Sequence, residues 1–105
     1  MKVRVLSPVH REIVEAMKYL EGRAGLGADF FDLVYQQLDA IEADPFAFPL
    51  WEMNTIDVEI RRVILTRFQY VIYFQIVRDE AVILSVSHGK RDAGVWLGRV
   101  QRTDD

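Results

Sequence analysis

The sequence predicts an α+β protein in which a helix hairpin packs on a mostly antiparallel, twisted sheet. Three observations support this prediction. Apolar residues recur at helical spacing over two segments of the first half, glycines separate those segments, and three apolar strand-like runs fill residues 58–87. The expected order is β-α-α-β-β-β, and residues 90–102 could form a short C-terminal helix.

Length and composition set the class of protein. The 105 residues fit a single domain over residues 1–105. Half of the residues are hydrophobic and 28% are charged, which is typical of a globular chain. The absence of cysteine excludes disulfides and thiolate metal sites. No signal peptide is expected at the N-terminus, and no apolar run approaches the ~20 residues that span a bilayer. We therefore expect a cytoplasmic protein with no membrane partner.

Charge is distributed unevenly along the chain. Residues 1–57 hold 5 Lys/Arg and 10 Asp/Glu, whereas residues 58–105 hold 8 Lys/Arg and 6 Asp/Glu, two of them the terminal Asp104 and Asp105. The halves therefore carry −5 and +2, which sum to the net charge of −3. This balance argues against a general nucleic-acid binder. It fits either two faces with different partners or ordinary surface charge.

The first helix follows a short strand at residues 2–6, where polar and apolar residues alternate. Ser7 is expected to be its N-cap, with Pro8 in the first helical position. Glycines are expected to end the helix and allow a turn, namely Gly22, Gly25 and Gly27. The apolar stripe of this helix is Val9, Ile13, Ala16, Met17 and Leu20.

A second helix is expected over residues 28–43. Asp29 and Asp32 lie near its N-terminus, where the helix dipole favours carboxylates. It should end at Asp44, because the residue before a proline avoids helical angles. A short turn between two helices predicts an antiparallel hairpin. The buried stripe is Phe30, Phe31, Val34, Leu38 and Ile41.

Strands are predicted at residues 58–66, 69–77 and 81–87. An aromatic-rich connector at residues 45–57 precedes them, and we favour a loop folded over the core above a binding loop. The polar turn at residues 78–80 predicts a hairpin of the last two strands. The middle strand is apolar on both faces apart from Gln75, which indicates a central strand that is covered on both sides.

The residues with the clearest chemical potential cluster after the last strand. His88 is followed by Gly89, Lys90 and Arg91, and Arg62 and Arg67 lie on or beside a neighbouring strand. A histidine among guanidinium groups could move a proton during cleavage of a phosphodiester while the arginines stabilise the developing charge. Further along the rim, aromatic side chains that could stack on an unpaired base are Tyr73 and Trp96.

Structural roles compete with each of these assignments. A histidine beside a glycine is commonly a turn residue, and Trp96 is commonly a core anchor. Arg61 and Arg62 must point to opposite faces of their strand, as must Tyr70 and Tyr73. The chain has no His-x-His or His-x-x-x-His pair and no phosphate-binding glycine loop, so neither a metal nor a small-molecule cofactor is expected.

The order of elements and several strings resemble the RelE/ParE superfamily of type II toxins over nearly the full length. Family members often have proline where this chain has Gln69, and also near Ala93 or Gly94, so the departures affect turns. The strings that carry the resemblance are Gly25–Phe30, Ile41–Pro45 leading to Phe48-Pro49, Arg61–Leu65, Phe68–Tyr73, and Val86–Asp92 with Trp96 and Arg99.

This resemblance implies a growth-inhibiting toxin that is neutralised by a cognate antitoxin protein. ParE-like members inhibit DNA gyrase and need no hydrolytic site. RelE-like members cut mRNA on the ribosome, as metal-independent endoribonucleases, and the matching catalytic positions would be His88, Arg62 or Arg67, and Arg91. The expected target-binding rim is Lys90, Tyr73, Trp96 and Arg99. The acidic balance and the single plausible catalytic group favour the gyrase-directed activity.

Overall fold

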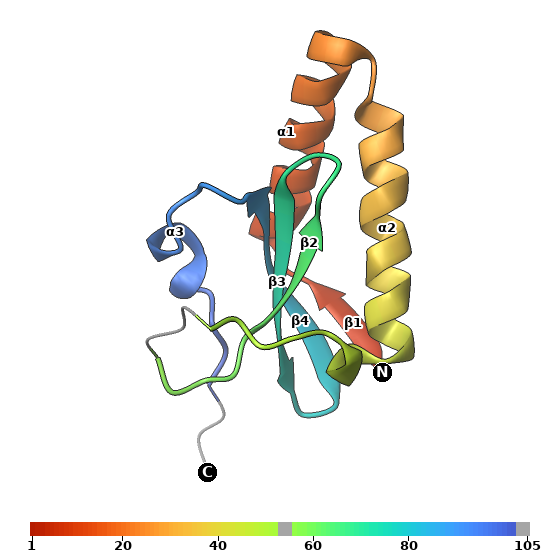
Figure 1. Ribbon diagram of the computed structural model, residues 1–105. Helices are drawn as coiled ribbons and strands as arrows, with labels where there is room; N and C mark the ends of the chain where they lie inside the picture. The colour runs from red at the N-terminus through yellow and green to blue at the C-terminus, as the bar shows by residue number, and fades with distance from the viewer. Residues whose placement is uncertain (53–55, 103–105) are drawn as a thin grey trace.

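A computed structural model of the chain describes residues 1–52 and 56–102 (Figure 1). Its helices and strands follow each other in the predicted order. Residues 53–55 of the connector and the terminal Asp104 and Asp105 lie outside the described residues. The elements are β1 (Lys2–Val5), α1 (Ser7–Ala24), α2 (Gly27–Ala43), the 3-10 helix η1 (Pro45–Ala47), β2 (Arg61–Leu65), β3 (Tyr70–Val77), β4 (Glu80–His88) and α3 (Gly94–Leu97). The α+β class and the short C-terminal helix are confirmed.

The four strands form one sheet in the order β1-β4-β3-β2. β2 and β3 pair antiparallel, as do β3 and β4, whereas β1 pairs parallel with β4. The β3–β4 turn has only two residues, Arg78 and Asp79, with φ of 49° and 65°. Two left-handed residues match the twist of the strands they join, which is why this tight hairpin can form. β3 therefore lies in the interior of the sheet, as its two apolar faces predicted.

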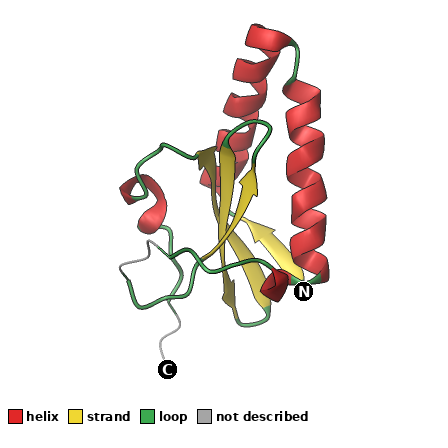
Figure 2. Ribbon diagram, in the orientation of Figure 1, coloured by secondary structure: helices red, strands yellow, loops and turns green. Residues whose placement is uncertain are grey.

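The two long helices form the predicted hairpin, which Figure 2 shows beside the sheet. Gly25 ends α1 with φ of 69°, a left-handed conformation that glycine adopts without strain. A Cβ on Gly27 would meet the backbone oxygen of Met17 at 2.8 Å, so glycine allows the close approach of the two helices. The N-cap prediction was wrong by one residue. Leu6 is the N-cap without a side-chain bond, and Ser7 is already helical.

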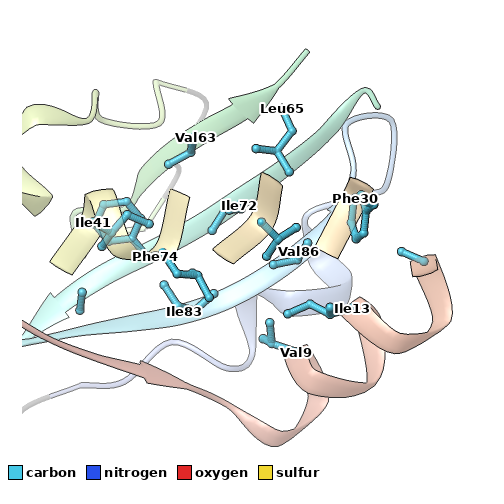
Figure 3. Close-up of a cluster of buried hydrophobic side chains, with 14 residues drawn as sticks. Val9, Ile13, Phe30, Ile41, Val63, Leu65, Ile72, Phe74, Ile83 and Val86 are labelled. Carbon is cyan, nitrogen blue, oxygen red and sulfur yellow. The ribbon is translucent and has the colours of Figure 1, made fainter. Parts of the chain in front are cut away.

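Both helices pack on one face of the sheet and enclose the larger apolar cluster (Figure 3). Phe30 is fully buried and meets the edges of Phe68 and Tyr70, with centroid distances of 5.4 and 5.0 Å. Phe31 was expected on the buried stripe but is 38% exposed and stacks on Tyr35 instead. The helical period explains this, because a residue adjacent to a central core position is turned by about 100° away from it.

The opposite face of the sheet carries a smaller cluster under α3 and the connector (Figure 1). Its fully buried members are Ile60, Val82, Leu84 and Trp96. The connector folds back over the core, as favoured from the sequence. In it, Trp51 donates its backbone N–H to Ile60 and packs against Trp96 with ring centroids 5.3 Å apart.

Candidate functional site

A cleft of about 200 Å³ lies between α1 and the end of β4, where the sequence placed its candidate chemistry. His88 is exposed there, and its ring packs edge-to-face with the Tyr70 ring, with centroids 5.7 Å apart. Tyr19 of α1 also lines the cleft. The Nδ1 atom of His88 accepts the backbone N–H of Lys90 at 3.2 Å. This bond fits the tautomer in which Nε2 carries the ring hydrogen, so Nε2–H is the group that can donate. Arg91 also lines the cleft, so two of the four candidate catalytic residues come together.

Glu12 of α1 binds the residues around this cleft, and its side chain is only 8% exposed. Its Oε1 atom accepts the backbone N–H of Val86 at 3.1 Å and the hydroxyl of Ser85 at 3.3 Å. Its Oε2 atom accepts Nη1 of Arg91 at 2.9 Å and Nη1 of Arg99 at 3.1 Å. We refer to these four bonds as the Glu12 clasp. They satisfy a buried carboxylate that would otherwise be costly to desolvate.

The clasp lies along the part of β4 that has β3 on one side and no strand on the other. β1 pairs only with residues 80–83 of β4, so the edge beyond Ile83 is open on that side. Arg99 also donates Nη1 to the backbone oxygen of Leu84 at 3.0 Å. Side chains from α1 and from the C-terminal segment therefore replace a missing strand. An exposed row of unpaired backbone groups is a site of unwanted strand pairing, and this cover removes it.

Arg62 lies on the other face of the sheet, away from the cleft. It pairs across strands with Tyr73, and its Nε atom is buried with no hydrogen-bond partner among the described residues. Burial raises the pKa of the Tyr73 hydroxyl, and the Arg62 charge opposes that rise. Tyr70, by contrast, belongs to the helix-side cluster. The two tyrosines thus face opposite sides, as the strand period required.

Arg67 lies in the β2–β3 turn and points toward α2. Its Nη2 atom is 3.3 Å from Oδ2 of Asp29, and its guanidinium lies 5.1 Å from the centre of the Phe68 ring. Asp29 and Arg67 line a groove of about 490 Å³ between α2 and the β2 edge. Arg62, Arg67 and His88 are therefore on three different surfaces, and only Arg91 shares the cleft of His88.

The expected target-binding rim is only partly formed. Lys90 is exposed. Trp96 is 1% exposed and stacks on Tyr73 with centroids 4.3 Å apart, so its assignment to the rim was wrong. The reason is that α3 is a single turn and needs one large apolar side chain to hold it on the sheet. Arg99, 19% exposed, is held in the clasp rather than displayed.

Glu12 was absent from the sequence analysis, although the sequence contains a signal for it. The buried positions of α1 are Val9, Glu12, Ile13 and Ala16, which follow the i, i+3, i+4, i+7 pattern of a buried helix face. A carboxylate at such a position must be paired. The partners, however, are more than 70 positions away along the chain, and only the folded sheet brings them together.

Chemically, the cleft can bind through an exposed imidazole, two tyrosine rings and one partly exposed guanidinium. Within residues 1–52 and 56–102, acidic and histidine side chains do not gather in the groups of three that would hold a metal ion. None of the helices in these ranges has the length and apolar character to cross a bilayer. In comparisons with known proteins, neither a protein-family model nor a curated sequence matches this chain.

Proposed function

We propose that this protein is the toxin of a type II toxin–antitoxin pair and that it arrests growth by binding DNA gyrase without hydrolysing nucleic acid. The proposal begins from the resemblance to the RelE/ParE superfamily. The helix hairpin on a four-stranded sheet, with the element order that the resemblance implies, supports it at the level of the fold. The partner that neutralises it would be an antitoxin protein, and no cofactor is required.

The observation that favours binding over hydrolysis is the separation of the candidate catalytic residues. A ribonuclease needs an acid or base and several cations around one phosphate. Here Arg62 lies on the α3 side of the sheet, and Arg67 is paired with Asp29 at the α2 groove. Arg91 already shares a carboxylate with Arg99. A net charge of −3 also gives weak attraction for a polyanion.

The test is expression of the chain without an antitoxin, followed by two assays with the purified protein. We expect growth arrest, inhibition of gyrase supercoiling and no cleavage of mRNA on ribosomes. Arrest of translation with normal supercoiling would contradict the gyrase assignment. Unimpaired growth on induction would contradict the toxin assignment as a whole.

A second function, ribosome-dependent cleavage of mRNA, is favoured by one observation. His88 and Arg91 line the same cleft, and Nε2 of His88 is the nitrogen left for proton transfer. Under this alternative, His88→Ala should reduce mRNA cleavage by about 100-fold or more, the usual contribution of a general acid or base. Under the gyrase proposal the same variant should retain most of its supercoiling inhibition.

A further inference from the structure

The Glu12 clasp joins three parts of the chain that are far apart in sequence: α1, the open edge of β4 and the C-terminal segment, residues 89–102. Only one oxygen of the Glu12 carboxylate covers the open edge of β4, because Oε1 alone accepts the Val86 N–H and the Ser85 hydroxyl. Oε2 is given entirely to the two arginines. Arg99 also covers the edge, because it binds the backbone oxygen of Leu84, so edge protection leaves only the bond between Glu12 and Arg91 unexplained.

The two arginines are held in unequal ways. Arg99 is 19% exposed, and the same Nη1 atom that binds Glu12 also binds Leu84. The Arg91 side chain is 36% exposed and lines the cleft beside His88; within residues 1–52 and 56–102 its one hydrogen bond is to Glu12. One carboxylate faces two guanidinium groups in the clasp, and the exposed Glu15 also lines the cleft, so the cleft carries no clear excess of positive charge. Because Arg91 is the more exposed of the two arginines, its remaining N–H groups are what the clasp presents to the cleft.

We propose that Glu12 is a positioning residue that fixes Arg91 at the cleft, so that its remaining N–H groups face a carboxylate on the target protein. A guanidinium held at one end is pre-organised, and less side-chain freedom is lost when the other end binds. The partner is thus an acidic protein surface. This inference rests on the proposed function, because it takes Arg91, and not His88, as part of the surface that binds gyrase.

The decisive experiment is a double-mutant cycle with Glu12→Gln and Arg91→Ala, measured as the concentration that half-inhibits gyrase supercoiling. Glutamine keeps an oxygen for Val86 N–H but turns an N–H₂ group toward the arginines. We expect each single variant to need about tenfold more protein, the loss of one charge-assisted hydrogen bond. The double variant should be no weaker than Arg91→Ala alone, because Glu12 acts through Arg91. Additive losses would overturn the proposal.

A second readout needs no target. Hydrogen exchange at the amides of residues 92–97 is measured in the same four proteins. If the clasp fixes this segment, the amides of both single variants should exchange about tenfold faster than those of the wild type. The double variant should then exchange at the same rate as the single variants. If circular dichroism shows that Glu12→Gln does not fold, Glu12→Asp replaces it in the cycle. Aspartate keeps the negative charge, but its side chain is one methylene shorter and holds the carboxylate farther from the arginines. Unchanged exchange in the single variants would overturn the clasp as a fixing device.

The matched control is Asp39→Asn on α2, which also removes one negative charge from a helix. Asp39 is exposed and makes no ion pair or hydrogen bond to the other described residues. It should leave both inhibition and hydrogen exchange unchanged, so a loss there would assign the Glu12 effect to net charge and overturn the proposal. If the wild-type protein fails to inhibit gyrase, the proposed function fails, and hydrogen exchange alone then decides whether the clasp fixes the segment.

Discussion

The two sides of the sheet are covered in different ways. On the helix side, two long helices cover a continuous apolar cluster of 14 buried residues in the described part of the chain. On the other side, α3 has four residues and its buried cluster has four members. There the C-terminal segment is also held by polar bonds, namely the Glu12 clasp and a pair between the Gln75 amide and the backbone of Gln101. Short irregular segments bury too little apolar area to stay in place, so polar anchors supply the rest.

The largest effect should come from the helix side. Phe30→Ala removes a fully buried ring that touches two other aromatic rings. We expect a loss of about 3–5 kcal/mol in the free energy of unfolding, because the surrounding elements cannot collapse into the space. Urea denaturation should show one cooperative transition at a lower midpoint. If the variant instead kept the wild-type midpoint for the main unfolding transition and lost only local structure, the helix side would not determine the global stability.

Trp96→Ala tests the other side and should cost less, about 2–3 kcal/mol. The lost burial is large, but α3 can detach while the helix-side cluster stays folded, which limits the cost. The emission of Trp51, which packs on Trp96, should shift to longer wavelength well before the far-ultraviolet circular dichroism changes. Coincident transitions for both signals would mean that the two sides unfold as one unit.

Two glycine variants test how closely α1 and α2 approach each other. Gly27→Ala places a Cβ 2.8 Å from a backbone oxygen of α1, so the helices must separate at a cost of about 1–3 kcal/mol. Gly22→Ala is the control, because nothing lies within 4 Å of its Cβ position. Within a helix it should stabilise by about 0.5 kcal/mol. Thermal melts of the two variants should therefore move in opposite directions.

The smallest effect is a pH dependence shared by both sides. Burial raises the pKa of Tyr70, which is on the helix side, and of Tyr73, which is on the α3 side, above the ordinary value of 10.0. The folded protein therefore binds more protons than the unfolded chain near that pH, and the free energy of unfolding falls as pH rises through it. Each Tyr→Phe variant should lose less stability than wild type as pH rises above the ordinary tyrosine pKa of 10.0. Equal slopes in all three proteins would contradict the burial of these hydroxyls.

Most of the fold could be predicted from the sequence, because it depends on local periodicity. The stripe of α2 apart from Phe31 and the central position of β3 follow from patterns within a few residues. Of the three glycines expected to end α1, only Gly25 does so, because Gly22 lies inside α1 and Gly27 begins α2. Ser7 was misplaced because a serine before a proline fits both the N-cap and the first helical turn, and the backbone decides between them.

The candidate site could be predicted less completely. His88 and Arg91 are three residues apart, so their proximity follows from the chain itself. Arg67 and Asp29 are 38 positions apart, and their pairing depends on how α2 crosses the sheet. Trp96 illustrates the same limit. The sequence of a one-turn helix such as α3 does not decide whether its tryptophan is exposed or buried. That depends on whether a long helix already covers this face of the sheet, which only the fold shows.

One feature of the sheet has a consequence for how the chain folds. β1 precedes the other strands of the sheet in the sequence, yet its parallel neighbour β4 follows them all, with Lys2 opposite Glu80. During synthesis β1 has no partner until residues 80–83 have emerged, whereas β3 and β4 are joined by a two-residue turn and can pair as soon as β4 has been made. Pairing over such a distance carries a high cost in chain entropy. Docking of β1 should therefore be the late step of folding, and the edge of β4 stays open to wrong partners until it happens.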